Sequence, residues 1–92
     1  MTDFAKRVYA AVLKIPLGQV RSYKWVARQA GRPRAYRATG QVLKNNPYPL
    51  VIPCHRVVNS DRSPGGYIFG GRAKRSLLEL EKNIKRCIEN KN

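Results

Sequence analysis

The strongest constraint on the fold is a break near the middle of the chain. The stretch Asn45–Pro49 places two asparagines ahead of Pro47 and Pro49, a combination that ends any helix reaching it. Apolar residues before this break recur at helical spacing, whereas the segment directly after it is irregular. The 92 residues fit one domain, 1–92, with a modest core.

Three helices are predicted before the break. The first begins at Thr2 or Asp3 and ends before Pro16. Its apolar residues at helical spacing are Phe4, Val8, Ala11 and Val12. The second covers 23–30, with Ser22 as its N-cap.

The third helix is predicted to start at Pro33, because proline fits the first turn, and to run to about Lys44. Its inner stripe is Ala35, Ala38 and Val42, and its opposite side carries Arg34, Arg37, Gln41 and Lys44. With a turn at Gly31, the residues of about 22–44 have the pattern of a helix-turn-helix unit. The alternative is a solvated basic surface on an ordinary helical hairpin.

The charge of the chain favours DNA binding. Lys and Arg total 19 against 5 Asp and Glu, a formal net charge of +14. Such an excess indicates a polyanionic partner, with nucleic acid first and a ribosomal or membrane-surface role as the competing explanation. No apolar run approaches the ~20 residues that span a bilayer, and the N-terminus lacks the layout of a signal peptide. We therefore expect an intracellular protein with reduced thiols and no membrane partner.

The segment after the break places a thiol beside an imidazole. Cys54 stands between Pro53 and His55, and apolar residues flank all three in the range 50–58. This pattern indicates a thiol held rigidly at a pocket wall. A buried structural cysteine beside a surface histidine is the alternative, because a free cysteine often behaves as a small core residue.

A last helix is predicted from about Arg72, after a loop rich in glycine. Its inner face is Ala73, Leu77, Leu80, Ile84 and Cys87 or Ile88. Glu81 falls on this apolar face, where a carboxylate needs a partner, and His55 is the only histidine in the chain. The alternative places Glu81 at the edge of the face, in contact with solvent.

A cysteine next to a histidine that a glutamate holds is the general arrangement for generating a thiolate. Two cysteines and one histidine lack the ligand pairs of a zinc module, so no metal site is expected. On a basic domain, the thiolate points to chemistry on a DNA base rotated out of the stack. Arg37 is the candidate that fills the vacated space, and Tyr23 the candidate that steers the nucleotide.

These residues resemble the O6-alkylguanine-DNA alkyltransferases, also called methylated-DNA–protein-cysteine methyltransferases. The segment Pro53-Cys54-His55-Arg56-Val57 is similar to the active-site signature of that family. Further matches, in the same order, are Gly18-Gln19-Val20 with Ser22-Tyr23, Arg37-Ala38 before Gly40, Asn46-Pro47, and Gly66-Tyr67 ahead of Gly70. The resemblance implies a mainly α, winged helix-turn-helix-like domain of about four to five helices with at most a short β element.

The resemblance also implies a role for each residue. Cys54 accepts the alkyl group from the guanine O6 of double-stranded DNA and acts once, without metal or organic cofactor. His55 acts through a water as the base, Glu81 orients it, and Asn46 braces the loop. The expected contacts with DNA and the flipped base are Tyr23, Arg34, Arg37, Gln41, Lys44, Tyr67 and the Val57 carbonyl. We expect a monomer.

Two departures from the family pattern stand out. Most members carry an additional N-terminal domain, and Gln41 and Lys44 stand where a small residue and often arginine are typical. One alternative function is a non-catalytic alkyltransferase-like protein, in which the acceptor cysteine is replaced, commonly by tryptophan. Another is a plain helix-turn-helix DNA binder with a structural Cys54.

Overall fold

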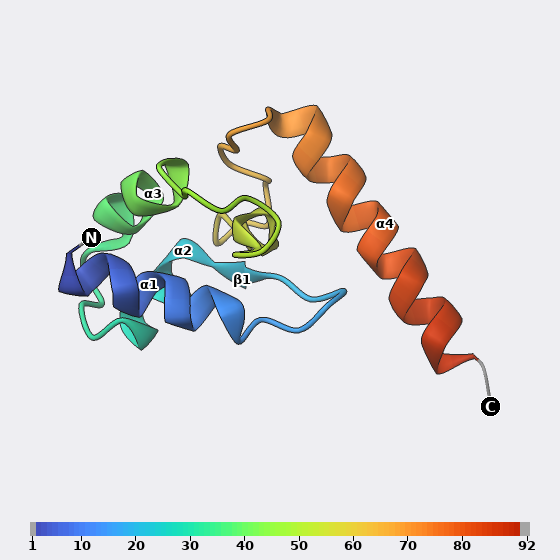
Figure 1. Ribbon diagram of the computed structural model, residues 1–92, viewed down its shortest axis with the longest axis horizontal. Coiled ribbons are helices and arrows are strands. Elements are labelled where there is room, and N and C mark those ends of the chain that lie inside the picture. Colours follow the sequence, from blue (N-terminus) through green and yellow to red (C-terminus); the bar gives the residue numbers. More distant parts are fainter. Residues whose placement is uncertain (1, 91–92) are drawn as a thin grey trace.

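The structure of the protein, a computed structural model, describes residues 2–90 (Figure 1). Within this range the chain forms four α-helices, one short 3-10 helix and two short strands. In chain order these are α1 (Asp3–Leu13), β1 (Arg21–Ser22), α2 (Tyr23–Gln29), α3 (Tyr36–Lys44), η1 (Cys54–Arg56), β2 (Val57–Val58) and α4 (Gly71–Glu89). The predicted fold class, mainly helical with a short β element, is confirmed.

The first two helices begin at the side chains predicted to cap them. Thr2 Oγ1 accepts the N–H of Ala5 at 3.1 Å, and Ser22 Oγ accepts the N–H of Trp25 at 3.0 Å. Each hydroxyl satisfies an amide that has no partner inside its helix. Gly31 closes α2 with a φ of +85°, a left-handed conformation that glycine adopts without steric cost.

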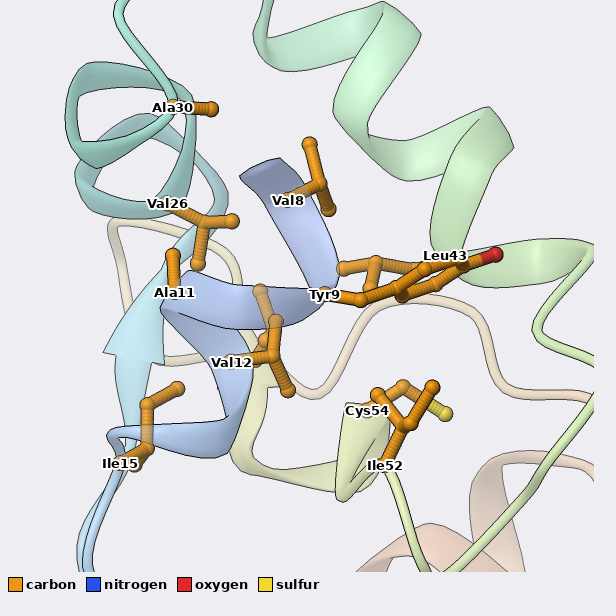
Figure 2. Packing of buried hydrophobic residues seen from close by; sticks show 11 residues of the cluster. Val8, Tyr9, Ala11, Val12, Ile15, Val26, Ala30, Leu43, Ile52 and Cys54 are labelled. Carbon is orange, nitrogen blue, oxygen red and sulfur yellow. The ribbon is translucent and has the colours of Figure 1, made fainter. Parts of the chain in front are cut away.

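The core lies among α1, α2 and α3, which contact one another. Figure 2 shows Val8, Val12 and Val26 at its centre, with Cys54 at its edge. The phenol of Tyr9 joins α1 to α3, because its Oη donates to the Val42 carbonyl at 2.8 Å. The segment that carries the thiol is therefore packed directly against the helical layer.

A two-stranded parallel sheet joins the two halves of the chain. Arg21 pairs with Val57 and Ser22 pairs with Val58. Because β1 leads straight into α2 and β2 follows η1, this pairing places the start of α2 beside the cysteine segment.

The predicted start of the third helix is wrong, and its predicted inner face is wrong in part. Pro33 lies in a turn instead, closed by the Ala35 N–H donating to the Arg32 carbonyl at 2.9 Å, and α3 begins three residues later. The fixed φ of proline suits the second position of such a turn as well as a helix start. The buried residues of α3 are Thr39 and Leu43, whereas Ala38 of the predicted stripe is exposed and Ala35 and Val42 are half-buried. Thr39 tolerates burial because its hydroxyl donates to the Ala35 carbonyl at 2.9 Å.

The predicted inner face of the last helix is also wrong in part. Its buried residues are Lys74 and Glu81, while Ala73 and Leu77 are half-buried. The remaining predicted positions, Leu80, Ile84, Cys87 and Ile88, are exposed. Figure 1 shows the reason: α4 stands at one end of the molecule, and its C-terminal turns project past the helical layer. Its contact with the rest of the fold is made largely with η1.

Candidate active site

Cys54 begins η1 and is 5% exposed. Its Sγ accepts a hydrogen bond from Asn46 Nδ2 at 3.4 Å, and the same amide nitrogen donates to the Ile52 carbonyl at 3.0 Å. The Asn46 Oδ1 accepts the N–H of Tyr48 at 2.9 Å. One buried side chain therefore ties both ends of the loop together and contacts the sulfur, and this contact with the sulfur was not expected from the sequence.

His55 and Glu81 form a buried pair. The distance between His55 Nε2 and Glu81 Oε2 is 2.8 Å, and the two residues are 2% and 8% exposed. The alternative that Glu81 reaches solvent is therefore wrong. The other ring nitrogen, His55 Nδ1, is buried and has no hydrogen-bond partner among the described residues.

Arg56 completes this cluster, and sequence reasoning assigned it no role. Its Nε donates to Glu81 Oε1 at 2.9 Å and its Nη2 to Glu81 Oε2 at 2.8 Å, while Nη1 donates to the Ile15 carbonyl at 2.9 Å. A paired bond of this kind holds the carboxylate in one orientation. Burial alone would raise the pKa of Glu81, but the hydrogen bonds and charges of Arg56 and His55 hold this pKa below its ordinary value.

A cavity of about 480 Å³ opens in front of the thiol. It is lined by Tyr23, Gly40, Leu43, Lys44, Asn45, Cys54, Gly66, Tyr67 and Ile68. Its volume falls within the range of small-molecule sites. Burial is the main cause that raises the pKa of both Tyr23 and Tyr67, and the electrostatic effect of nearby Cys54 adds to it. At Tyr67 the charge of Glu81 raises the pKa further. The Tyr67 hydroxyl is buried without a partner in residues 2–90, and the ring meets His55 edge-on at 6.2 Å between centroids.

Lys74 is the main residue of this region that the sequence analysis missed. It is fully buried, and its Nζ donates to the Gly66 carbonyl at 3.1 Å and to Tyr23 Oη at 3.4 Å. The ammonium lies 5.6 Å from the Tyr23 ring centroid. Burial lowers the pKa of Lys74 to about 8, against a smaller opposing effect of the Cys54 charge. A signal was present in the sequence, since Lys74 and Glu81 are seven residues apart and share one helix face.

The depressed pKa of Lys74 predicts a rise in stability with pH. Above pH 8 the folded state releases this proton, whereas the unfolded chain holds it up to its ordinary pKa of 10.5. The free energy of unfolding should therefore increase from pH 8 to 9.5, by about 1 kcal/mol per unit, and Lys74→Met should remove that increase. Denaturant unfolding across this range measures it, with Lys14→Met as the exposed control. An increase that persists in Lys74→Met would contradict the assignment.

Four of the predicted DNA contacts lie on α3 or directly before it. Arg37, Gln41 and Lys44 are exposed on α3, and Arg34 is exposed in the preceding turn. Lys44 lines the cavity in front of the thiol, but Arg34 lines a separate hollow with Arg32, Pro33 and Ala35. Val57 is buried in β2 and is absent from the cavity lining.

Arg37 occupies a second hollow, of about 560 Å³, next to the first. Tyr23, Gly40 and Gly66 line both hollows, so the two adjoin along these residues. No atom lies within 4 Å of where a side chain on Gly40 would begin, which leaves the passage between them open. The hollow lined by Arg37 therefore adjoins the cavity lined by Cys54.

No group of three or more His, Cys, Asp or Glu residues in the range 2–90 is arranged to hold a metal ion. Over the same range, no helix has the length and apolar content required to cross a membrane.

Comparisons with known proteins agree with this geometry. The family model for the DNA-binding domain of 6-O-methylguanine DNA methyltransferase matches residues 3–83. A methylated-DNA–protein-cysteine methyltransferase of Methanosarcina barkeri is 49% identical over 82 residues, which cover 89% of this chain and 52% of the relative. The corresponding Mycobacterium tuberculosis protein is 48% identical, with 89% and 50% covered. The chain spans about half the length of these curated relatives.

Solved structures show the same similarity. M. tuberculosis OGT in complex with DNA has a TM-score of 0.88 and 47% identity, covering 90% of this chain and 52% of that one. S. pombe Atl1, in complex with damaged DNA containing O6-carboxymethylguanine, has a TM-score of 0.77 and 34% identity, covering 88% and 77%.

Proposed function

The chain belongs to the family of the 6-O-methylguanine DNA methyltransferase DNA-binding domain, and we propose that it repairs DNA by transferring the alkyl group of O6-alkylguanine to Cys54. The observation that carries this proposal is the thiol itself. It stands at the wall of a cavity of about 480 Å³, beside a histidine whose ring a buried glutamate holds. Each molecule would act once, because the thioether has no route back to a thiol.

The proposed reaction is a displacement at the alkyl carbon. A bond forms between Cys54 Sγ and that carbon as the bond from the carbon to guanine O6 breaks. The thiol proton is removed by the protein, and a proton returns to the guanine ring, which leaves as ordinary guanine. The balance needs neither a metal nor an organic cofactor.

The buried cluster supplies the nucleophile in this scheme. Glu81 binds His55 through Nε2, so Nδ1 is left to take the thiol proton through a water. The Asn46 amide then donates to the sulfur and stabilises the thiolate. Lys74 adds a buried cation. The charge of Cys54 raises the pKa of Lys74, which supports a favourable interaction between the ammonium and the thiolate.

The opposite wall of the cavity would assist the leaving guanine. Tyr23 would hydrogen-bond the flipped base, and Lys74, whose Nζ donates to the Tyr23 hydroxyl, would orient it. Tyr67 lines the pocket. We also propose that the Val57 carbonyl accepts from the guanine amino group, although Val57 is absent from the lining of the cavity. A donor aimed at the departing base lowers the barrier, because negative charge develops there during the displacement.

Base flipping accounts for the two adjoining hollows. A base must leave the duplex to reach a thiol that is 5% exposed. Arg37 lies in the outer hollow and would fill the space in the stack. Arg34, Gln41 and Lys44, all exposed, would contact the DNA around it. The proposed partner is thus double-stranded DNA that carries O6-alkylguanine.

Arg37→Ala should slow repair of duplex DNA about 10- to 100-fold, because the few kcal/mol of unstacking would no longer be offset. Transfer from the free base O6-benzylguanine should change little, since nothing is unstacked. Rates of thioether formation on both substrates measure this, with Arg28→Ala as a matched control. Equal losses on both substrates would exclude the role in flipping.

The proposed function is tested by intact-protein mass spectrometry after mixing with a duplex that carries one O6-methylguanine. The expected result is a gain of one CH2 that maps to Cys54, with guanine restored in the DNA. The second candidate is a non-catalytic lesion-binding protein that recruits another pathway, favoured by the 77% coverage of Atl1. Selective binding of the lesion without any gain in mass would establish this second candidate.

A further inference from the structure

A second basic surface lies apart from the cavity of the thiol. A groove of about 570 Å³ opens between the turn before β1, the loop after β2, and α4. Four cationic side chains and one carboxylate are among its lining residues: Arg21, Arg62, Arg75, Lys82 and Glu79. The name flank groove is used for this hollow below.

The charges of the flank groove are not neutralised within the protein. The ion pairs in residues 2–90 are Asp3–Arg7, His55–Glu81, Arg56–Glu81 and Lys85–Glu89, and none involves a lining residue. Arg21 is fixed by neutral acceptors only, since it donates to the Val20 carbonyl and to Gln19 Oε1, each at 2.8 Å. Its guanidinium stacks 5.5 Å from the Trp25 ring centroid.

The backbone conformation places Arg62, one of the four cationic residues, in the flank groove. Arg62 has a φ of +70°, a costly left-handed conformation for a residue other than glycine. Its N–H donates to the Asn59 carbonyl at 2.8 Å, and the Asn59 N–H donates to the Ser63 carbonyl at 2.9 Å. This tight turn places Arg62 in the flank groove while Ser60 and Asp61 line the hollow of Arg37.

Close packing of α4 on the turn before β1 holds two walls of the flank groove together. A β-carbon at Gly18 would lie 2.6 Å from Lys85 Cδ, so the stem of Lys85 rests directly on the glycine backbone. Gly18 also has a φ of +81°. The groove is therefore a shaped surface, formed by segments far apart in the sequence.

We propose that the flank groove binds the phosphodiester backbone of the DNA duplex on one side of the lesion. This inference rests on the DNA binding set out under Proposed function and adds a contact outside the helix-turn-helix unit. Free arginine and lysine side chains are the usual partners of DNA phosphates. The loop of Arg62 is a common wall of the flank groove and the hollow of Arg37, so one duplex can follow both. The molecule is 42 Å long, about 12 base pairs of B-form DNA.

The test measures how binding depends on salt and on duplex length. Affinities of the wild type and of the double variant Arg75→Gln/Lys82→Gln are measured on lesion-centred duplexes of about 8 to 24 base pairs. Each phosphate contact adds about 0.9 to the slope of log affinity against log salt, so the double variant should lose about 1.8 on long duplexes. On the shortest duplex the loss should be smaller. Lys6→Gln/Lys14→Gln removes the same charge elsewhere and should keep the wild-type slope.

A second variant guards against misfolding. Glu79→Gln removes the carboxylate from the flank groove and should tighten binding of long duplexes, a gain that a damaged fold cannot produce. An unchanged slope on the longest duplex, a loss equal to that of the control pair, or a loss independent of length would each overturn the proposal.

The two proposals also fail separately. If the double variant transfers the alkyl group normally and keeps the wild-type salt slope, only the flank-groove proposal is refuted. If the double variant has a reduced salt slope but Cys54 of the wild-type protein gains no alkyl group, the flank-groove proposal stands and the proposal of alkyl transfer is refuted.

Discussion

Cys54→Ser is expected to abolish alkyl transfer completely while lesion-containing DNA is still bound. A serine hydroxyl is far less acidic than a thiol and is a poor nucleophile at an alkyl carbon, so the same surroundings cannot activate it. The substitution changes one buried atom and leaves the rest of the cavity lining and the exposed face of α3 intact. Mass spectrometry and a binding titration on the same O6-methylguanine duplex measure the two properties.

The matched control for this change is Cys87→Ser. Cys87 is the other free cysteine and is exposed on α4, so it should have no part in transfer. Complete transfer by this variant, together with none by Cys54→Ser, identifies a single acceptor. Methylation that persists in Cys54→Ser would refute the assignment, and loss of DNA binding would show that the thiol has a structural role.

Glu81→Gln is expected to destabilise the fold by about 3 kcal/mol, since one change leaves the partly buried charge of Arg56 without its partner. The same change should slow transfer about 100-fold and move the pH–rate profile to higher pH. The imidazolium that forms when His55 takes the thiol proton would lose its counter-charge, so a higher pH would be needed to generate the thiolate. Urea unfolding and single-turnover rates at several pH values measure these effects. A pH–rate profile identical to that of the wild type would leave Glu81 only a structural role.

Acid titration supplies an independent check on the same carboxylate. The folded-state pKa of Glu81 is lowered, so its contribution to stability is present above its ordinary pKa and is lost as the pH falls through the folded value. The stability difference between the wild type and Glu81→Gln should therefore shrink on acidification. Glu89→Gln, at an exposed position of the same helix, should show no such convergence.

The helix boundaries could be predicted only where a local side chain decides them. Thr2, Ser22 and Gly31 act on amides or angles within their own turns, so α1 and α2 were predicted closely. Pro33 is compatible with both a helix start and a turn, and the hydrogen bond from the Ala35 N–H to the Arg32 carbonyl shows that it forms the turn. The inner face of α3 shifted for a related reason, because burial of Thr39 needs a hydrogen bond that apolar periodicity does not register.

The candidate site shows the same division. A buried Glu81 with His55 as its partner could be inferred, because a carboxylate on an apolar face requires a partner and the chain has one histidine. The link from Asn46 to the sulfur, the grip of Arg56 and the position of Lys74 depend on distances between separate elements. Apolar spacing favoured Leu80 and Ile84 over Lys74 on the inner face, but only tertiary packing determines which face of a helix is covered.

The docking of α4 completes the site in the proposed mechanism, because this helix supplies two charged residues of the site. Its two buried residues are the charged Lys74 and Glu81, and these contact Gly66, Tyr23, His55 and Arg56. Charged side chains fit a partner in one register only, whereas an apolar stripe can slide. Lys74 and Glu81 follow Cys54 and His55 in the sequence and are therefore synthesised after them. In the proposed mechanism, a nascent chain that already holds its thiol and its base still lacks the carboxylate that orients the base. Transfer from O6-alkylguanine would thus begin only when α4 has docked.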